Sequence, residues 1–207
     1  RVVAASSPTG PAFEGAEISC GQRAAPGAIE RVRIDPVTLE SRIKVVGVDE
    51  WSDDPSFAEQ VEAVGVTGVC GSGIIEVLGE MILAGLIDED GVIQGSKAEN
   101  SDRVIEDGRT FSYVLWRGAV ELKITQTDIR SIQLAKAALY AGVKLLMDKL
   151  EISEVRKIKL AGAFGSYIDP KYAILIALIP DCDLSKVSGV GNAAGTGARM
   201  ALLNRGH

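Results

Sequence analysis

Residues 157–203, near the C-terminal end of the chain, read KIKLAGAFGSYIDPKYAILIALIPDCDLSKVSGVGNAAGTGARMALL. This stretch repeats one order of elements twice: a short β-type run, a glycine turn and a helical run. Asp169 is a typical N-cap and Pro170 a typical first-turn residue, so the first helix is expected to begin there and to extend through Leu178. Alternating strands and helices predict an α/β layered fold rather than a β-sandwich. The other expected positions are strands at 157–160 and 187–190, turns at 161–165 and 191–195, and a second helix at 196–203.

The two glycine turns are the strongest functional signal in the sequence. Glycine between a strand and a helix lets a ligand approach the backbone closely and directs N–H groups outward, where the helix dipole favours negative charge. Nucleotide binding and simple tight packing both explain such a pattern. Neither turn is followed by the lysine of a P-loop, and the GxGxxxG run at 189–195 is one residue longer than the dinucleotide fingerprint.

The earlier part of the chain predicts strands and two further helices. A helix is expected to open at Gly71 and to end near Gly85, with an apolar face and with Glu76 and Glu80 off that face. A capping box at 125–128 opens a long core-covering helix. That helix is expected to extend to Leu150, and the strands are expected at 28–34, 43–48, 111–116 and 120–124, with turns at Asp35-Pro36 and Arg117-Gly118.

Composition excludes several classes of function. The 207 residues carry 22 basic and 28 acidic side chains, a formal net charge of −6. This balance argues against nucleic acid as a partner, because phosphate binding needs clustered lysine and arginine. The densest apolar run, 173–179, is far shorter than the about 20 residues that cross a bilayer, so no membrane segment is expected. The length suits one domain or one lobe of a larger one.

Histidine and cysteine are scarce. His207, the one histidine, is the last residue and is expected to be a solvated chain end, which argues against Ser–His–Asp and Cys–His mechanisms. Cys20, Cys70 and Cys182 form no CxxC pair, so no metal site or cluster is expected from this chain alone. Reduced thiols in a cytoplasmic protein are the favoured interpretation. The chain opens without methionine, which favours a fragment of a longer protein.

A series of motifs along nearly the whole chain resembles a known family. In the same order, these motifs occur in the C-terminal domain of reductive activators of corrinoid proteins, which belong to the actin-like ATPase superfamily (ASKHA, ribonuclease H-like). The motifs are GPAFEGA at 10–16, CGQRAAPGAIE at 20–30, GVCGSG at 68–73, ITQTDIR at 124–130, LAK at 134–136, LAGAFG at 160–165 and GNAAGTGA at 191–198.

The resemblance implies a fold and a function. Residues 1–207 would be the second lobe of an actin-like ATPase domain, an incomplete mixed sheet with flanking helices, lacking the first lobe and an N-terminal 2Fe–2S ferredoxin domain. Such activators use ATP with Mg²⁺ to return the Co(II) corrinoid of a methyltransferase corrinoid protein to Co(I). This lobe would contribute adenosine binding and docking of the corrinoid protein, and the whole protein could form a homodimer.

The resemblance also implies site residues. The turn LAGAFG is similar to the superfamily's adenosine motif, and GNAAGTGA is similar to the small-residue helix at the crossing between the lobes. Glu14 is the carboxylate of the GPAFEG loop, and a ribose contact or a helix cap is favoured there over a catalytic role with Mg²⁺ or water. The cofactor-binding residues implied are Gly162, Ala163, Phe164, Gly165, Gly191, Asn192 and Gly195.

Two alternatives remain open on the sequence. The family's acidic phosphate motifs, DxGTT and DxGTN, are absent from the chain, so by itself it is expected to have negligible ATPase activity. One alternative is therefore a docking module that binds a corrinoid protein without using nucleotide. The other is an activator of a different reductase, such as a 2-hydroxyacyl-CoA dehydratase. The spacing of Cys20, Cys70 and Cys182 gives that second alternative no support, because those activators bind a cluster through cysteines of the ATPase domain.

Overall fold

The computed structural model describes residues 2–204, except for the side chain of Ala163. His207, expected to be a solvated chain end, lies outside the described residues. The elements, in chain order, are η1 (Ala12–Glu14), β1 (Ala28–Ile34), β2 (Ser41–Val45), α1 (Phe57–Glu62), β3 (Gly68–Val69), α2 (Gly71–Leu83), η2 (Gly95–Glu99), β4 (Val104–Asp107), β5 (Thr110–Trp116), β6 (Leu122–Thr125), α3 (Gln126–Leu150), β7 (Ile158–Leu160), α4 (Ala163–Tyr167), α5 (Pro170–Leu175), η3 (Leu184–Lys186), β8 (Val187–Gly189) and α6 (Ala193–Leu203).

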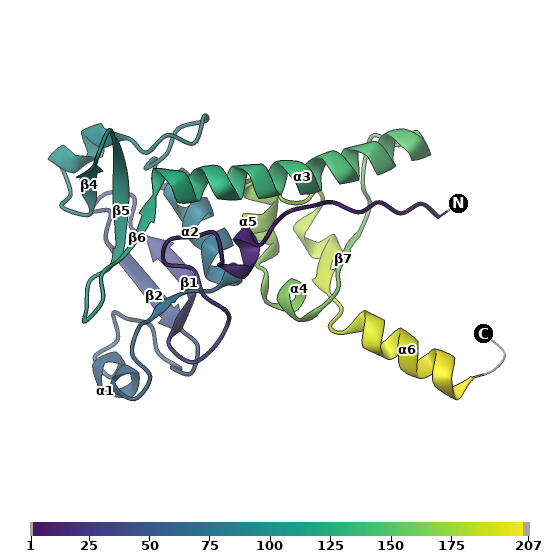
Figure 1. Cartoon of the computed structure of the whole chain (residues 1–207), viewed down its shortest axis with the longest axis horizontal. Helices are drawn as coiled ribbons and strands as arrows, with labels where there is room; N and C mark the ends of the chain where they lie inside the picture. The colour runs from purple at the N-terminus through teal and green to yellow at the C-terminus, as the bar shows by residue number, and fades with distance from the viewer. Residues whose placement is uncertain (1, 205–207) are drawn as a thin grey trace.

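The strands form small sheets beside the helices, which confirms the mixed α/β class. The described sheets have the orders β2-β1-β3, β4-β5-β6 and β7-β8. The first is mixed, because β1 pairs antiparallel with β2 and parallel with β3, whereas β7 and β8 are parallel. Helix α3 extends from the β4-β5-β6 sheet past α5, and α6 projects away from the body (Figure 1). The mixed sheet expected from the sequence is thus divided among separate small sheets.

The strand predictions differ from the structure in detail. β1 has the predicted bounds, and Tyr113 of β5 pairs with Ile124 of β6, as expected for the strands around Arg117-Gly118. The second predicted strand, 43–48, lies instead at 41–45, because Gly47 has a φ of 90° and turns the chain. Strand β4 was not predicted, because its four residues VIED are two apolar residues followed by two acidic ones, which is neither the alternation nor the long β-branched run that indicates a strand.

Helix α3 begins at the predicted capping box. The Thr125 side chain accepts from the Asp128 N–H, and the Asp128 carboxylate accepts from the Thr125 N–H at 2.8 Å. Asp128 is 1% exposed and also accepts the Ser19 N–H at 2.7 Å. One carboxylate therefore caps α3 and holds the loop that contains the CGQRAA motif.

The positions of Glu76 and Glu80 correct the sequence prediction. Both were expected off the apolar face of α2, yet they are 0% and 6% exposed. Their carboxylates accept the N–H groups of Val32 at 3.0 Å and Ile34 at 2.8 Å. β3 pairs only with the beginning of β1, so α2 lies along the remaining edge of β1 and supplies the missing acceptors. Edge N–H groups must be paired when buried, and here two side chains replace a strand.

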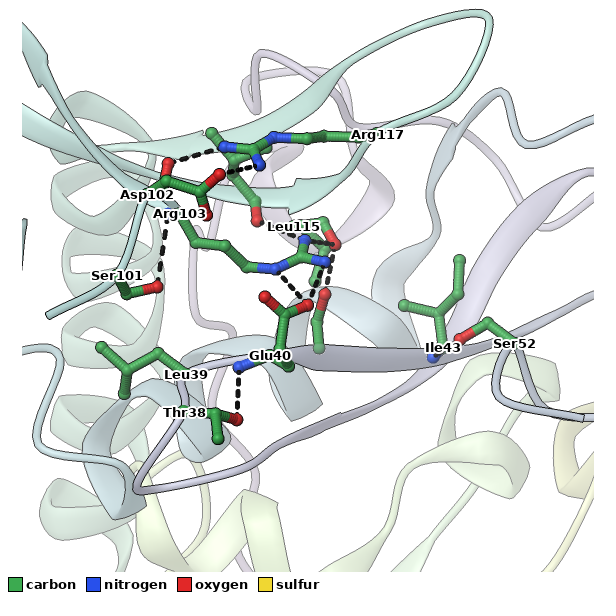
Figure 2. A network of polar contacts seen from close by, with 12 residues as sticks. Thr38, Leu39, Glu40, Ile43, Ser52, Ser101, Asp102, Arg103, Leu115 and Arg117 are labelled. Atoms are coloured by element: carbon green, nitrogen blue, oxygen red, sulfur yellow. Dashed lines mark hydrogen bonds and ion pairs between the residues drawn. The ribbon is translucent and has the colours of Figure 1, made fainter.

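Polar contacts hold the β4-β5-β6 sheet against the first sheet. The Arg103 guanidinium lies between the Glu40 carboxylate, at 2.8 Å from Nε, and the Leu115 carbonyl oxygen, at 3.3 Å from Nη1 (Figure 2). Nearby, Arg117 donates to Asp102 at 2.6 Å. Arg103 thus joins the loop between β1 and β2 to β5. Among the described residues, no helix combines the length and the hydropathy needed to cross a lipid bilayer.

Candidate functional site

The two glycine turns lie side by side and are hydrogen-bonded to each other. Strands β7 and β8 pair in parallel, with Leu160 opposite Gly189, so both turns leave the same edge of that sheet. The Val190 N–H donates to the Leu160 carbonyl at 2.9 Å, and the Gly162 N–H donates to the Gly191 carbonyl at 2.7 Å. The structure therefore unites the two turns that the sequence singled out.

Gly162 has a backbone conformation that only glycine adopts readily. Its φ is 95° and its ψ is 167°, a region closed to residues with a Cβ. An added Cβ would meet no atom within 4 Å. The need for glycine at this position therefore comes from the backbone conformation and not from steric crowding. The space beside the turn is open.

The helix predicted from Asp169 and Pro170 begins there, as α5, but the first turn also contains an unpredicted short helix and α6 begins earlier than expected. α4 starts at Ala163, inside the segment expected to be a turn, because Gly162 alone reverses the chain. α6 starts at Ala193 because Asn192 is its N-cap and accepts the Gly195 N–H at 2.8 Å. The helix expected to reach Leu178 ends at Leu175 as α5, and Ala177 has a φ of 54°.

The two turns differ in how their N–H groups are used. At the second turn, the Gly191 carbonyl accepts from Ala193 as well as from Gly162, and the Asn192 side chain occupies the Gly195 N–H. Several N–H groups that were expected to face a ligand are thus satisfied within the protein. The first turn has no side-chain cap, so no side chain of the turn takes up the N–H groups at the start of α4.

Three motif segments converge beside the first turn. An added Cβ at Gly71, the first residue of α2, would overlap the Phe13 carbonyl oxygen and the Phe164 ring. Phe13 is buried, whereas Phe164 is 42% exposed and follows the turn on α4. Gly165 packs beneath the turn, where an added Cβ would lie 3.1 Å from the Leu160 carbonyl carbon. The absence of a side chain at Gly71 thus lets an aromatic side chain of α4 contact the start of α2.

Two neighbouring pockets adjoin these residues. One, of about 570 Å³, lies between the start of α2 and α4. The other, of about 520 Å³, lies between the N-terminal segment, α3, β7 and α4, and includes Ala161 and Gly165. Phe13, Glu14 and Phe164 line both pockets. The remaining lining residues of the first pocket are Gln22, Arg23, Ala24, Glu30, Val46, Cys70, Gly71, Ser72 and Tyr167.

Glu14 is exposed at the junction of the pockets. It ends the short helix η1, and Gly15, with a φ of 84°, turns the chain directly after it. Among residues 2–204, no hydrogen bond to its carboxylate is found, so it caps no helix there. A free carboxylate beside an aromatic pocket is suited to accept hydrogen bonds from the hydroxyl groups of a sugar.

The cysteines are free thiols, and Cys20 is held in its protonated form. Burial, and then the nearby Asp128 carboxylate, raise the pKa of Cys20 to about 12. Cys70 is buried, and its thiol donates to the Ile29 carbonyl at 3.3 Å. Within the described part of the chain, no group of three His, Cys, Asp or Glu side chains is arranged to hold a metal ion.

Sequence reasoning named the turns and Glu14 but missed other residues of the pockets. Phe13 and Gly71 belong to motifs that were recognised, yet nothing in their spacing placed them against Phe164. Arg23 and Glu30 belong to the recognised motif at 20–30, and Tyr167 belongs to none. Their spacing did not place any of the three at the pocket, because their approach depends on how the first sheet packs near α4. Motifs that lie far apart in sequence meet at these pockets, and their meeting can be recognised only when the fold is known.

The fold is that of an ASKHA domain, the actin-like ATPase class. The family model described as the C-terminal domain of RACo, the ASKHA domain, matches residues 1–207, and the chain belongs to this family.

Relatives cover almost all of the chain. It is 34% identical to the corrinoid activation enzyme RamQ of Eubacterium limosum, over 97% of this chain and 33% of that protein. It is 26% identical to a [Co(II) methylated amine-specific corrinoid protein] reductase of Methanosarcina barkeri, over 99% of this chain and 36% of that protein. A solved structure of a reductive activator for corrinoid,iron-sulfur protein superposes with a TM-score of 0.76 and 37% identity, over 95% of this chain and 30% of the other. The chain spans about a third of the length of these relatives.

Proposed function

We propose that this chain is the second lobe of the ATPase domain of a reductive activator, which uses ATP to return a Co(II) corrinoid protein to Co(I). Its own part is to bind the adenosine portion of the nucleotide and to contribute to docking of the corrinoid protein. The relatives are named for corrinoid activation and for reduction of a Co(II) corrinoid protein, which supports this class of activity. A cytoplasmic location and a homodimer belong to the same proposal.

The observation that carries the proposal is that three residues next to Gly162 in the first turn, Ala161, Phe164 and Gly165, line the same pocket as Phe13 and Glu14. The apolar walls formed by Phe13 and Phe164 fit the face of a purine base, and Glu14 fits the hydroxyl groups of a ribose. The conformation and open surroundings of Gly162 fit a backbone that a ligand approaches closely. The residues present therefore suit adenosine.

The described residues do not supply a metal site, so the proposal assigns Mg²⁺ and the phosphate groups to the other lobe. ATP hydrolysis supplies the free energy for an unfavourable transfer of one electron to cobalt. In this proposal a 2Fe–2S cluster in another domain of the intact protein would supply the electron. What this chain does is bind the nucleotide more tightly in one arrangement of the lobes than in another, which shifts the population toward the arrangement that docks the corrinoid protein.

The test uses the intact protein that carries this chain and a Co(II) corrinoid protein. Under anaerobic conditions, the absorbance of Co(I) reports reduction with and without ATP. Gly162→Asp places a charged side chain in the open space beside the turn, where the adenosine part of ATP is proposed to bind, and it is expected to abolish ATP-dependent reduction. Gly108→Asp is the matched control, because Gly108 also has a positive φ and open surroundings but lies in the turn between β4 and β5.

A docking module without nucleotide binding is the second candidate function. It would be favoured if Gly162→Asp left both the rate of reduction and its dependence on ATP unchanged. The exposed aromatic side chains Phe164 and Tyr167 on α4 are the observation in its favour, because such side chains commonly anchor partner proteins.

A further inference from the structure

Two glycines of α2 each receive an aromatic ring from the segment that follows the Gly162 turn. Gly71 lies against the Phe164 ring, and Gly79 lies against the Tyr172 ring, where an added Cβ would be 2.5 Å from Tyr172 Cδ1. Phe164 belongs to α4 and Tyr172 to α5. Eight residues along a helix correspond to about 12 Å. The α4–α5 segment is therefore fixed to α2 at two separate points, so that both its place and its direction are set.

The second of these points lies outside the pockets and is polar as well as apolar. Tyr172 is 1% exposed, and its hydroxyl group donates to Glu80 Oε1. Glu80 Oε2 accepts the Ile34 N–H at 2.8 Å. The Glu80 carboxylate thus joins α5 to β1, and neither residue lines the two pockets beside the turn.

Two cationic side chains lie close to the Tyr172 ring and help to hold it in place. The Arg33 guanidinium lies 5.2 Å and the Lys171 ammonium 4.8 Å from the ring centroid, within the range of cation–π attraction. Arg33 also donates to Glu76 at 2.6 Å, next to the Glu76 contact with the Val32 N–H. Tyr172 therefore sits in a buried network that is continuous with the first sheet.

We infer that Tyr172, through Glu80, is a positioning residue for nucleotide binding at the Gly162 turn. The inference rests on the proposed function. The two rings fix α4–α5 on α2 at Gly71 and Gly79, and the Tyr172–Glu80 bond ties the second of these contacts to β1. Without it, the turn is no longer held in the geometry that receives adenosine, and affinity falls because the protein must be ordered on binding.

The test compares two buried tyrosines in the intact protein. Tyr172→Phe keeps the ring against Gly79 and removes only the hydroxyl group. Tyr113→Phe is the matched control, since Tyr113 is 0% exposed and its hydroxyl group donates to the Leu39 carbonyl at 2.8 Å, in a different part of the fold. Equilibrium titrations measure Kd for ATP and for inorganic tripolyphosphate, which lacks the adenosine part. Denaturant unfolding measures the stability of each variant.

Tyr172→Phe is expected to raise Kd for ATP about three- to tenfold, the range for one hydrogen bond, and to leave Kd for tripolyphosphate unchanged. Tyr113→Phe is expected to change neither the Kd for ATP nor the Kd for tripolyphosphate. Glu80→Gln retains an acceptor and gains a donor for the Tyr172 hydroxyl group, so its Kd for ATP is expected to stay near that of the wild type.

Each other outcome has a distinct meaning. Suppose that the wild type binds ATP. If the two tyrosine variants then change the Kd for ATP equally, or if Tyr172→Phe weakens the binding of tripolyphosphate as much as that of ATP, the positioning role is overturned and the proposed function stands. If the wild-type protein does not bind ATP, the proposed function fails and this inference fails with it.

Discussion

The Gly162 N–H donates to the Gly191 carbonyl at 2.7 Å, which makes one structure of two turns that lie far apart in sequence. Their strands are parallel neighbours, and in α/β sheets ligands bind beyond the carboxyl ends of such strands. Because this bond occupies the Gly162 N–H, that group is not available to a ligand. Gly162 contributes instead its backbone conformation and the open space beside it. The Gly191 turn supports its neighbour and is itself held by the Asn192 cap.

Gly162→Ala is predicted to destabilise the protein despite the open space around it. Its φ of 95° and ψ of 167° strain any residue with a Cβ, at about 1–3 kcal/mol. Gly197→Ala is the control, because Gly197 lies inside α6, also has nothing within 4 Å of an added Cβ, and is expected to gain about 0.5–1 kcal/mol of helix stability. Chemical denaturation measures both. Equal effects would contradict the conformational argument.

Glu76→Leu is predicted to cost about 3–5 kcal/mol of unfolding free energy. The change removes the partner of Arg31 and Arg33, each at 2.6 Å, and leaves the Val32 N–H without its acceptor. Glu76→Gln is expected to cost less, since its amide oxygen still accepts from Val32. Glu62→Gln, at an exposed position on α1, should lie within about 0.5 kcal/mol of the wild type. A negligible cost for Glu76→Leu would show that α2 does not serve as the partner of the β1 edge.

Asp128→Ala is predicted to cost more than the loss of an ordinary helix cap. Asp128 is buried and accepts from Thr125 at 2.8 Å and from the N–H and hydroxyl groups of Ser19 at 2.7 Å, so we expect about 2–4 kcal/mol. Asp169→Ala removes a single bond, from the Lys171 N–H at 2.9 Å, and is expected to cost about 1 kcal/mol. Thermal unfolding of the two variants compares them directly, and similar shifts would argue against a link between the Ser19 loop and α3.

Cys20 is predicted to make the protein less stable at high pH. The unfolded chain loses the thiol proton near the ordinary pKa of 9.0, whereas burial and Asp128 hold the folded pKa at about 12. The contribution of this group to stability is complete below pH 9.0 and is lost as the pH rises toward about 12, because the unfolded state binds fewer protons there. Unfolding free energies of the wild type and of Cys20→Ala, measured across this range, should diverge at low pH and converge at high pH. If the two plots of unfolding free energy against pH stay parallel, Cys20 does not have the raised pKa of a buried thiol.

Periodicity and capping chemistry predicted much of the fold. The capping box before α3, the glycine turns before α4 and α6, and the apolar stretch of α2 all depend on residues close in sequence. The class of fold followed from the order of strands and helices. The division of the strands among separate small sheets did not follow from the sequence, because strand pairing between distant segments is not encoded locally.

The burial of charged side chains could not be predicted from local sequence patterns. Glu76 and Glu80 have the spacing of an exposed helix face, and only the edge of β1 explains why they are inside. The pocket is similar: Phe13, Gly71 and Phe164 come from three motifs, and their meeting depends on the packing of α4 against α2. The turns were recognisable from sequence, but the walls around them were not.

Nucleotide binding at the Gly162 turn is tested most directly by an equilibrium titration of ATP into the intact protein, comparing wild type, Gly162→Asp and Gly108→Asp. Wild type and Gly108→Asp are expected to bind ATP with the same Kd, and Gly162→Asp is expected to bind it at least tenfold more weakly. Equal binding by all three proteins, with each shown to be folded, would contradict the claim that the Gly162 turn is the nucleotide site.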